Sequence, residues 1–341
     1  MSDQTGHQGS RQPAEDARGG DGHPEDSRSA PTLRYRGPLS EFWHNFRANK
    51  LSLMGGVIVA LFVVAAIFAP LLATANPVEQ HRAPAGMHNP LPPFSTSEDG
   101  QFFLLGSDKF GRDIYSRALY GTRAMLRLAV GAVAVSFVIG VAMGAIAGYN
   151  RGRWIDEVIM RVVDITLSFP ALVLAIALLG ALGIGATKIG GVTLSNTFKI
   201  TVVIAVTYAP RFARVMRSVT LQEVSEDYVV AAQVIGASDS RIIIREVLVN
   251  TIPPIIVQGT LMMAETVLIS ASLSFLGLGL QPPAPSLGVM LNEARDFLFQ
   301  GSWWYAVVPG VFISLAILGF NLLGDGLRDS LDPKQARRVK V

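Results

Sequence analysis

Glu265 is the main candidate for chemistry inside the apolar part of this 341-residue sequence. It lies about halfway along the apolar stretch 251–280. A lone charge at the middle of a bilayer costs roughly 3 kcal/mol or more on insertion scales. Glu265 should therefore be protonated, paired or turned toward a water-filled cavity. Two interpretations stay open: it lines a translocation path, or it bonds a neighbouring helix.

Motifs for covalent chemistry are missing from the sequence. There is no G-x-x-x-x-G-K-[ST], no H-E-x-x-H and no G-x-S-x-G. The glycine-rich run 180–191 has Lys188 followed by Ile189 instead of the Ser or Thr that a phosphate-binding loop needs. The serines in 271–280 have no histidine nearby to activate them. We therefore predict no catalytic residue on this chain.

Metal ligands are scarce as well. The absence of cysteine excludes disulfides, Fe–S clusters and Cys-ligated zinc. The histidines all precede the second apolar segment, at His7, His23, His44, His81 and His88. His81 and His88 share a proline-rich loop, where no helix brings them onto one face, and a metal needs ligands at fixed geometry. We interpret them as solvated loop residues and predict no metal site.

The composition is that of a polytopic membrane protein. Hydrophobic residues make up 50% of the chain and charged residues 16%, against about 25% charged in soluble domains. The mean hydropathy is +0.39, and the charges cluster between long apolar runs. A net charge of +3 could suggest nucleic acid, but the basic residues stand at the ends of apolar segments. Membrane orientation explains them better, so no nucleic acid partner is expected.

Six segments are long and apolar enough to cross a bilayer as helices, which takes about 20 residues each. The predicted spans are 51–73, 124–149, 158–182, 197–215, 251–280 and 304–323. Pro170 should kink the third span, and Pro253 and Pro254 interrupt the start of the fifth. The predicted fold class is therefore an all-α integral membrane protein with six transmembrane helices.

The remaining segments complete the predicted layout. The first residues are polar and almost free of apolar side chains, which is typical of a disordered tail. Aromatic and basic residues in 34–50 indicate an interfacial helix. The chain divides into a disordered tail (1–33), an interfacial helix with the first span (34–73), an external loop (74–120), a domain of five spans (121–325) and a charged tail (326–341).

The cations indicate which side each loop faces. They gather before span one, between spans two and three, after span four and at the C-terminus. With six spans all these places lie on one side, which the positive-inside rule makes the cytoplasm. Both termini are then cytoplasmic. The segment 106–123 departs from the rule, because it holds four cations on the outer side; Asp108 and Asp113 offset part of that charge.

The cytoplasmic segment 225–249 predicts two short helices that meet at a glycine. Ser225 precedes two acids and suits an N-cap, and Gly236 suits a helix end. Ser238 or Asp239 can cap a second helix that runs to Pro253. The small side chains of Ala231 and Ala232 would let the first helix enter a groove on another protein. The alternative is an ordinary amphipathic loop on the membrane surface.

Four ordered blocks resemble one family. They are GSDKFGRDIYSRALYGTR (106–123), GYNRGRWIDEVIMRVVDITLSFP (148–170), SLSFLGLGLQPPAPSLG (272–288) and FNLLGDGLRDSLDP (320–333). Together they resemble the permease subunits of ABC importers, specifically the C-type permease of dipeptide and oligopeptide systems. The first block has Ser107 where the family has Thr. The resemblance spans roughly 34–333 and implies the type I ABC importer permease fold.

The resemblance gives the segment 225–249 a role. In the family, E-A-A-x-x-x-G-A-S and the residues after it form coupling helices that dock on an ATPase subunit. The implied ATPase-coupling residues are Ala231, Ala232, Gly236, Ala237, Ser238, Arg241 and Arg245. Val230 and Val249 stand where the family has Glu and Pro, which removes one charged contact.

The same resemblance implies the partners. A second permease subunit would complete the membrane path, two ATPase subunits would bind ATP and Mg, and an external substrate-binding protein would deliver the solute. The chain would sit in the lipid bilayer of a bacterial or archaeal cell membrane and carry no cofactor itself. It implies a peptide or another small solute without identifying it.

The alternative function is an ion-coupled secondary transporter that uses Glu265. Such transporters usually carry several intramembrane ionisable groups, and the apolar stretches here offer chiefly Glu265. A channel would need a filter or a charged ring, which is not evident.

Overall fold

A computed structural model describes residues 38–183, 185–189 and 192–331 of the chain. The predicted disordered tail 1–33 and residues 332–341 of the predicted C-terminal tail (326–341) lie outside the described residues.

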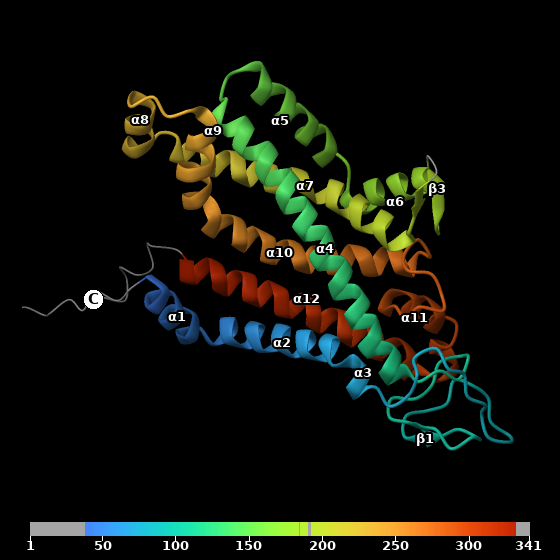
Figure 1. Ribbon diagram of the computed structural model, residues 1–341. Helices are drawn as coiled ribbons and strands as arrows, with labels where there is room; N and C mark the ends of the chain where they lie inside the picture. Colours follow the sequence, from blue (N-terminus) through green and yellow to red (C-terminus); the bar gives the residue numbers. More distant parts are fainter. Residues whose placement is uncertain (1–37, 184, 190–191, 332–341) are drawn as a thin grey trace, which may run out of the picture. The chain divides into compact units, whose positions relative to one another are not determined.

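The described part is mostly helical (Figure 1). The helices are α1 (Pro38–Ala48), α2 (Lys50–Ile67), α3 (Ala69–Leu72), α4 (Ile114–Tyr149), α5 (Trp154–Leu167), α6 (Ala171–Leu182), α7 (Asn196–Glu223), α8 (Asp227–Val234), α9 (Asp239–Arg241), the π-helical turn η1 (Ile242–Val247), α10 (Leu248–Phe275), α11 (Leu287–Ala294), the short 3₁₀ helix η2 (Leu298–Gln300) and α12 (Trp303–Leu331). Two antiparallel pairs, β1 (Ser95–Thr96) with β2 (Phe102–Phe103) and β3 (Thr187–Ile189) with β4 (Val192–Leu194), complete the list.

The predicted all-α membrane fold class is confirmed, with a qualification on the number of spans. Among the described residues, four helices are long and apolar enough to cross a membrane, or five if the bent pair α5–α6 is one span. The remaining predicted span, 197–215, coincides with α7, which has 28 residues but is less apolar. α7 can carry polar groups because α4, α5, α6 and α10 pack around it.

Several helix ends differ from the prediction. α4 begins at Ile114, well before the predicted 124, because the side chain of Asp113 accepts a hydrogen bond from the Ser116 N–H at 2.9 Å and caps the helix there. α2 ends at Ile67, short of the predicted 73. α12 runs to Leu331, beyond the predicted end at 323, so the first residues of the predicted tail are helical.

Pro170 breaks the third predicted span more sharply than a kink. α5 and α6 meet at 95° across a break of three residues, from Ser168 to Pro170. A proline disfavours helical geometry at the residue before it, so α5 ends at Leu167. The side chain of Lys199 on α7 is buried and donates to the Leu182 and Gly183 carbonyls at the end of α6. These hydrogen bonds hold the end of α6 against α7.

The pair of helices with the most extensive contact is α4 with α7. Gly140, Gly144 and Gly148 form a stripe at four-residue spacing on α4, which is one face of a helix. A Cβ on each would lie within 2.4–2.6 Å of α7 atoms. In lipid, helices associate by close packing of small residues rather than by a hydrophobic driving force. The glycine stripe is therefore what lets α7 lie against α4.

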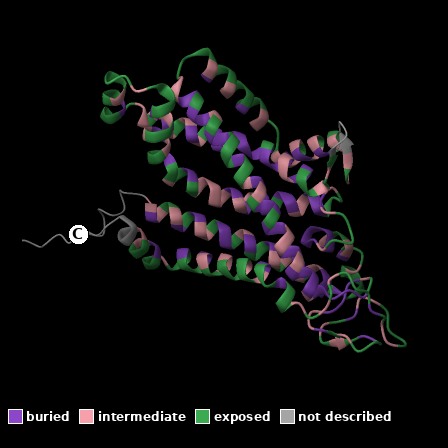
Figure 2. Ribbon diagram, in the orientation of Figure 1, coloured by how far each residue is buried: buried purple, intermediate pink, exposed green. Residues whose placement is uncertain are grey.

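Two apolar cores hold the bundle together. One lies where α4, α6, α7, η1 and α10 meet, and the other lies where α4, α10, α11 and α12 meet. α2 packs mainly on α12, and its other side is exposed and apolar, as Figure 2 shows along its length. An exposed apolar face on a helix of this length suits contact with lipid.

Candidate functional site

The predicted coupling segment 225–249 contains the break that the sequence indicated. α8 ends at Val234, and Gly236 follows with a φ of +80°. The Gly236 N–H donates to the Gln233 carbonyl at 3.0 Å and the Ala237 N–H to the Ala232 carbonyl at 3.0 Å. This is the Schellman arrangement, which places a residue with positive φ just after the helix. The prediction of a helix end at Gly236 is confirmed.

The predicted N-cap at Ser225 is wrong, whereas Ser238, one of the two residues predicted to cap the second helix, occupies the N-cap position of α9. Glu226, not Ser225, occupies the N-cap position of α8, and the Ser225 hydroxyl instead donates to the Gln222 carbonyl at 2.6 Å. Ser238 has the backbone geometry of an N-cap, but its side chain makes no capping hydrogen bond. Backbone geometry and packing therefore define these helix starts without side-chain caps.

The second predicted helix does not stop at Pro253. The segment from Asp239 to Phe275 runs on as one 37-residue helical stretch through both prolines. Its buried face continues across them. Side chains that are 0–2% exposed recur at Ile242, Val247, Thr251 and Ile255. Ile242 and Val247 are five residues apart, whereas the later members of the face are four apart. The π turn η1 supplies the extra residue that keeps the buried face in register.

Polar contacts hold α8 in place on the bundle. The Tyr228 hydroxyl donates to the Glu223 carboxylate and accepts from the Asn250 amide at 2.9 Å. Desolvation and then the bond to Glu223 raise the pKa of Tyr228 to about 12, so it stays a neutral donor at physiological pH. The Val229 side chain beside it is fully buried. No sequence motif indicates this anchor, because α7, α8 and α10 contribute one residue each.

A second contact ties the far side of the segment to α4. The Tyr149 hydroxyl, at the last residue of α4, donates to the Asp239 carboxylate at 2.7 Å. These residues lie 90 positions apart, so no local signal joins them. This bond holds α9 against α4, while the Tyr228 contacts hold α8 against α7 and α10.

The free surface of α8 is apolar. Val230, Val234 and Ile235 are exposed, the last two at 82% and 85%, and Figure 2 shows the exposed residues of α8 in green. We call these three residues the α8 tip. Of the predicted coupling residues, Ala232 and Ala237 are half-buried. The others are exposed: Ala231, Gly236, Ser238, Arg241 and Arg245.

Glu265 is paired with a neighbouring helix. Its carboxylate accepts from the guanidinium of Arg211 on α7, and the Tyr208 hydroxyl donates to the Glu265 backbone carbonyl at 3.4 Å. Of the two interpretations left open, the bond to another helix is thus present in the structure. However, the side chains of Arg211 and Glu265 are 36% and 42% exposed on the isolated chain, so the pair lies on its surface.

Two further arginines on α7 have acidic partners on α5. Arg217 binds Asp156 through two hydrogen bonds of 2.6 and 2.7 Å, and Arg214 binds Asp164 at 2.8 Å. Together with Arg211, these arginines are the cations that were predicted at the end of the fourth span. The structure places them inside α7, each with a partner, because that helix continues to Glu223.

The segment 106–123 forms a buried charged network at the other end of the bundle from α8 (Figure 1). Asp108 contacts Arg112 and Arg117, and the Arg112 guanidinium also reaches Glu293 of α11 at 3.1 Å. The Tyr305 hydroxyl of α12 donates to the same Glu293 carboxylate at 3.0 Å. This network joins the loop before α4 to α11 and α12, and it accounts for two of the four cations in 106–123, Arg112 and Arg117.

His81 is not a solvated loop residue, contrary to the prediction. Its side chain is buried, and Nδ1 lies 2.6 Å from Asp99. That bond is the main cause that lowers the pKa of Asp99 to about 2. Within the part of the chain that the structure describes, no group of three or more His, Asp or Glu side chains is arranged to hold a metal.

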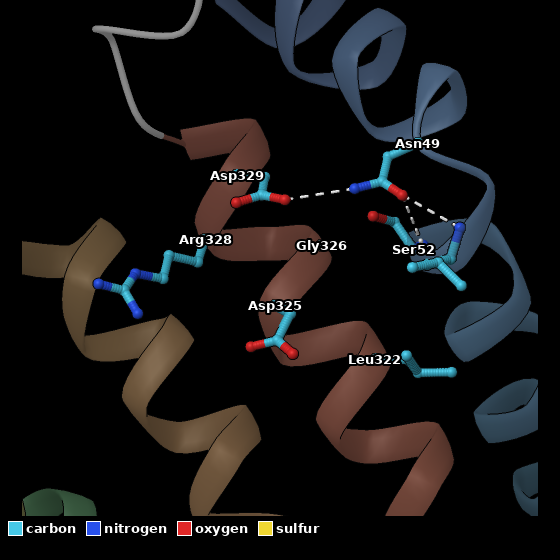
Figure 3. Close-up of a pocket in the computed structure, with 8 residues that line it drawn as sticks. Asn49, Ser52, Leu322, Asp325, Gly326, Arg328 and Asp329 are labelled. Atoms are coloured by element: carbon cyan, nitrogen blue, oxygen red, sulfur yellow. Dashed lines mark hydrogen bonds between the residues drawn. The ribbon is translucent and has the colours of Figure 1, made fainter.

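The last motif, 320–333, lines a cavity of about 530 Å³ between the start of α2 and the end of α12 (Figure 3). The Asn49 amide donates to the Asp329 carboxylate at 3.2 Å, and the Asn49 side-chain oxygen caps α2. Gly326 lies directly against Ser52. The block therefore joins α12 to α2, and its Asp325 side chain remains exposed.

Comparisons with known proteins agree on one family. The family model described as "Binding-protein-dependent transport system inner membrane component" matches residues 140–337. The model described as "N-terminal TM domain of oligopeptide transport permease C" matches residues 37–93.

Individual relatives are similar over nearly the whole chain. The di/tripeptide transport system permease protein DppC of Pseudomonas aeruginosa (strain UCBPP-PA14) is 41% identical over 307 residues, which are 90% of this chain and 95% of that protein. The dipeptide transport system permease protein DppC of Escherichia coli (strain K12) is 42% identical over 299 residues, 87% of this chain and 93% of that protein. The dipeptide transport system permease protein DppC of Alkalihalophilus pseudofirmus is 39% identical over 318 residues, 91% of this chain and 95% of that protein.

Proposed function

Since the chain belongs to the family of binding-protein-dependent transport system inner membrane components, we propose that it carries dipeptides or short oligopeptides as the C-type permease of an ATP-driven importer. The chain is a membrane-embedded transport subunit, and ATP hydrolysis in this family resides in separate subunits. The peptide substrate is proposed from relatives named as dipeptide and di/tripeptide permeases that match it over nearly its whole length.

The observation that carries the coupling mechanism is the anchored α8 with its apolar tip. Val234 and Ile235 project into solvent at the end of α8, which contacts to α7 and α10 hold in place, and α9 after it is bonded to α4. Fully burying a side chain of this size stabilises a complex by about 1.5–3 kcal/mol. The tip therefore suits insertion into a groove on an ATPase subunit, and Val230 adds apolar area where the family has Glu. Movement of the ATPase would then pass through Tyr149 and Tyr228 into α4 and α7.

The arrangement implies a topology. If α7 is counted as a span, the chain crosses the membrane six times. We then place α8, the start of α2, the end of α12 and both termini in the cytoplasm. Residues 74–113 and α11 then lie outside, where a substrate-binding protein would deliver the solute. A second permease would complete the path, and two ATPase subunits would bind ATP and Mg. The arginines of α7 have acidic partners, so we assign the orientation signal to Arg151, Arg153, Arg241 and Arg245.

Co-expression with the neighbouring genes tests the proposal. A tag on this chain should recover a second permease and an ATPase that has a phosphate-binding loop. Vesicles with the reconstituted complex should take up a dipeptide only with ATP and the binding protein. Recovery of the chain alone, or uptake without ATP, would contradict the proposal.

The secondary-transporter alternative depends on Glu265. A coupling carboxylate must gain and lose a proton or bind an ion, whereas Glu265 is paired with Arg211. Under that alternative, Glu265→Gln would abolish uptake and an ion gradient would replace ATP. The same vesicles decide the question when ATP is withheld and a proton or sodium gradient is imposed.

Substituting Gly236 should uncouple the ATPase from transport. The φ of +80° is strained for any residue with a Cβ, at roughly 1–2 kcal/mol, while open space surrounds the position. Gly236→Leu should therefore displace the α8 tip without harming the membrane part, and uptake should fall at least about threefold. Gly236→Asn is the control, because Asn tolerates this conformation. Equal uptake by the two variants, measured per inserted complex, would exclude a role for the Gly236 geometry.

A further inference from the structure

The Arg211–Glu265 pair lies on an open face of α7 and α10. Glu265 is near the middle of α10, and both side chains are more than one-third exposed on the isolated chain. Charged groups at such a depth do not face hydrocarbon, because the cost of desolvating them is high. The open face of α7 and α10 at this level therefore borders water or a polar partner.

Tyr208 supports both members of the pair from behind. Its ring is 3% exposed. The Arg211 guanidinium lies 5.2 Å from the centre of the ring, which is a cation–π distance, and the Tyr208 hydroxyl reaches the Glu265 backbone carbonyl. One buried side chain thus orients the cation and supports the backbone that carries the anion. The charged ends remain on the open side.

A cation next to an anion matches the two charges that every peptide with free termini carries. A guanidinium presents donors in a planar fork that fits a carboxylate, and a glutamate carboxylate accepts hydrogen bonds from an ammonium group. Peptides differ in their side chains, whereas the α-ammonium and α-carboxylate are common to all of them. A site for these two groups would accept many sequences.

We propose that the Arg211–Glu265 pair opens to receive a passing peptide, with Arg211 binding its terminal carboxylate and Glu265 its terminal ammonium group. The inference rests on the proposed function as a peptide permease. The substrate class is a short zwitterionic peptide with both ends free. In the absence of a peptide the two side chains bind each other, which is the state in the structure.

The exchange is energetically feasible because every charge keeps a partner. Before binding, Arg211 and Glu265 neutralise each other; afterwards each is neutralised by one end of the peptide. No charge is left buried and unpaired, which is the costly case. A half-exposed ion pair is worth only about 0–1 kcal/mol, so a peptide can compete for both partners and still leave.

The test uses the whole importer in vesicles: this chain, its partner permease, the ATPases and the binding protein. The double variant Arg211→Gln with Glu265→Gln keeps a hydrogen-bonded pair between α7 and α10 but removes both charges. We expect dipeptide uptake to fall about tenfold or more, since charge-assisted hydrogen bonds to the peptide are lost. ATP hydrolysis stimulated by the binding protein should stay within about twofold, so more ATP is used per peptide.

Two further variants separate substrate contact from a structural role. Arg214→Gln with Asp164→Asn removes an exposed ion pair that joins α7 to α5. This variant should leave uptake and ATP hydrolysis unchanged. The single variant Arg211→Lys keeps the cation but loses the fork, and it should raise the KM for transport more than it lowers the maximal rate. It keeps the inference testable if the double variant fails to assemble.

Several outcomes would overturn the inference. One is normal uptake by the double variant. Another is a parallel loss of uptake and ATP hydrolysis in the double variant, with both activities restored by the exchanged pair, Arg211→Glu with Glu265→Arg. That pattern is expected if the pair only bridges two helices. If the unaltered complex shows no uptake and no stimulated ATP hydrolysis, the proposed function itself fails, and that result is distinct from both.

Discussion

Ile235→Asp should abolish peptide uptake while the protein remains correctly inserted in the membrane. Ile235 is 85% exposed, so the substitution removes little packing within the chain. In the proposed complex the new carboxylate would be buried in an apolar groove without a partner, which costs several kcal/mol. We expect uptake to fall about 100-fold, since 1.4 kcal/mol corresponds to a factor of ten. ATPase recovered with the tagged chain should fall in parallel.

Met87→Asp is the matched control for Ile235→Asp. Met87 is also an exposed apolar side chain, at 57%, but it belongs to the segment between α3 and β1. Figure 1 shows that segment at the opposite end of the bundle from α8. Adding the same charge there should leave ATPase recovery unchanged. If Ile235→Asp retains both its ATPase and its uptake, the α8 tip is not the docking surface and another part of the segment 225–249 must make the contact.

Gly144→Leu should prevent the bundle from assembling. A Cβ at this position would lie 2.4 Å from the Ala213 carbonyl oxygen and 2.6 Å from the Met216 Cβ. The first of these atoms belongs to helix backbone, which cannot move without separating α4 from α7. Overpacking a core costs about 1–3 kcal/mol for added methylenes, and a leucine adds a whole side chain between two helices. We expect the amount of protein in the membrane and its Tm in detergent to fall sharply.

Gly131→Leu tests whether the effect depends on position. Gly131 lies on the same helix, but a Cβ there would meet only a methyl group of Thr201, at 3.4 Å. This variant should accumulate at close to the normal level, because that side chain has room to shift. Equal abundance of the Gly144 and Gly131 variants would mean that α4 and α7 do not need close contact through the glycine stripe.

Local features of the sequence predicted several parts of the fold correctly. The apolar runs located α2, α4, α10 and α12, because about 20 apolar residues suffice to identify a membrane helix. Gly236 located the end of α8, since a glycine with positive φ ends a helix through bonds among neighbours in the chain. Pro170 located the break between α5 and α6 through its effect on the preceding residue.

Predictions from single residues failed where distant packing outweighed local preference. Pro253 and Pro254 do not end the helix, because the buried face from Ile242 to Ile255 continues across them and holds it together. Ser225 suits an N-cap by type, yet Glu226 takes the position. α4 begins early because Asp113 caps it, and the loop that carries Asp113 is held by the network around Asp108, which includes Glu293, far along the chain.

By itself, the sequence determined that this chain is a helical membrane protein of one transport family, with a polar segment that a glycine divides into two helices. Only the tertiary structure decided that Glu265 pairs with Arg211, 54 positions away, and that Tyr228 anchors α8 and Tyr149 anchors α9. The reason is physical. Helix formation and membrane insertion depend on neighbours in the chain, whereas the partner of a charge depends on which helices pack together and on their relative rotation.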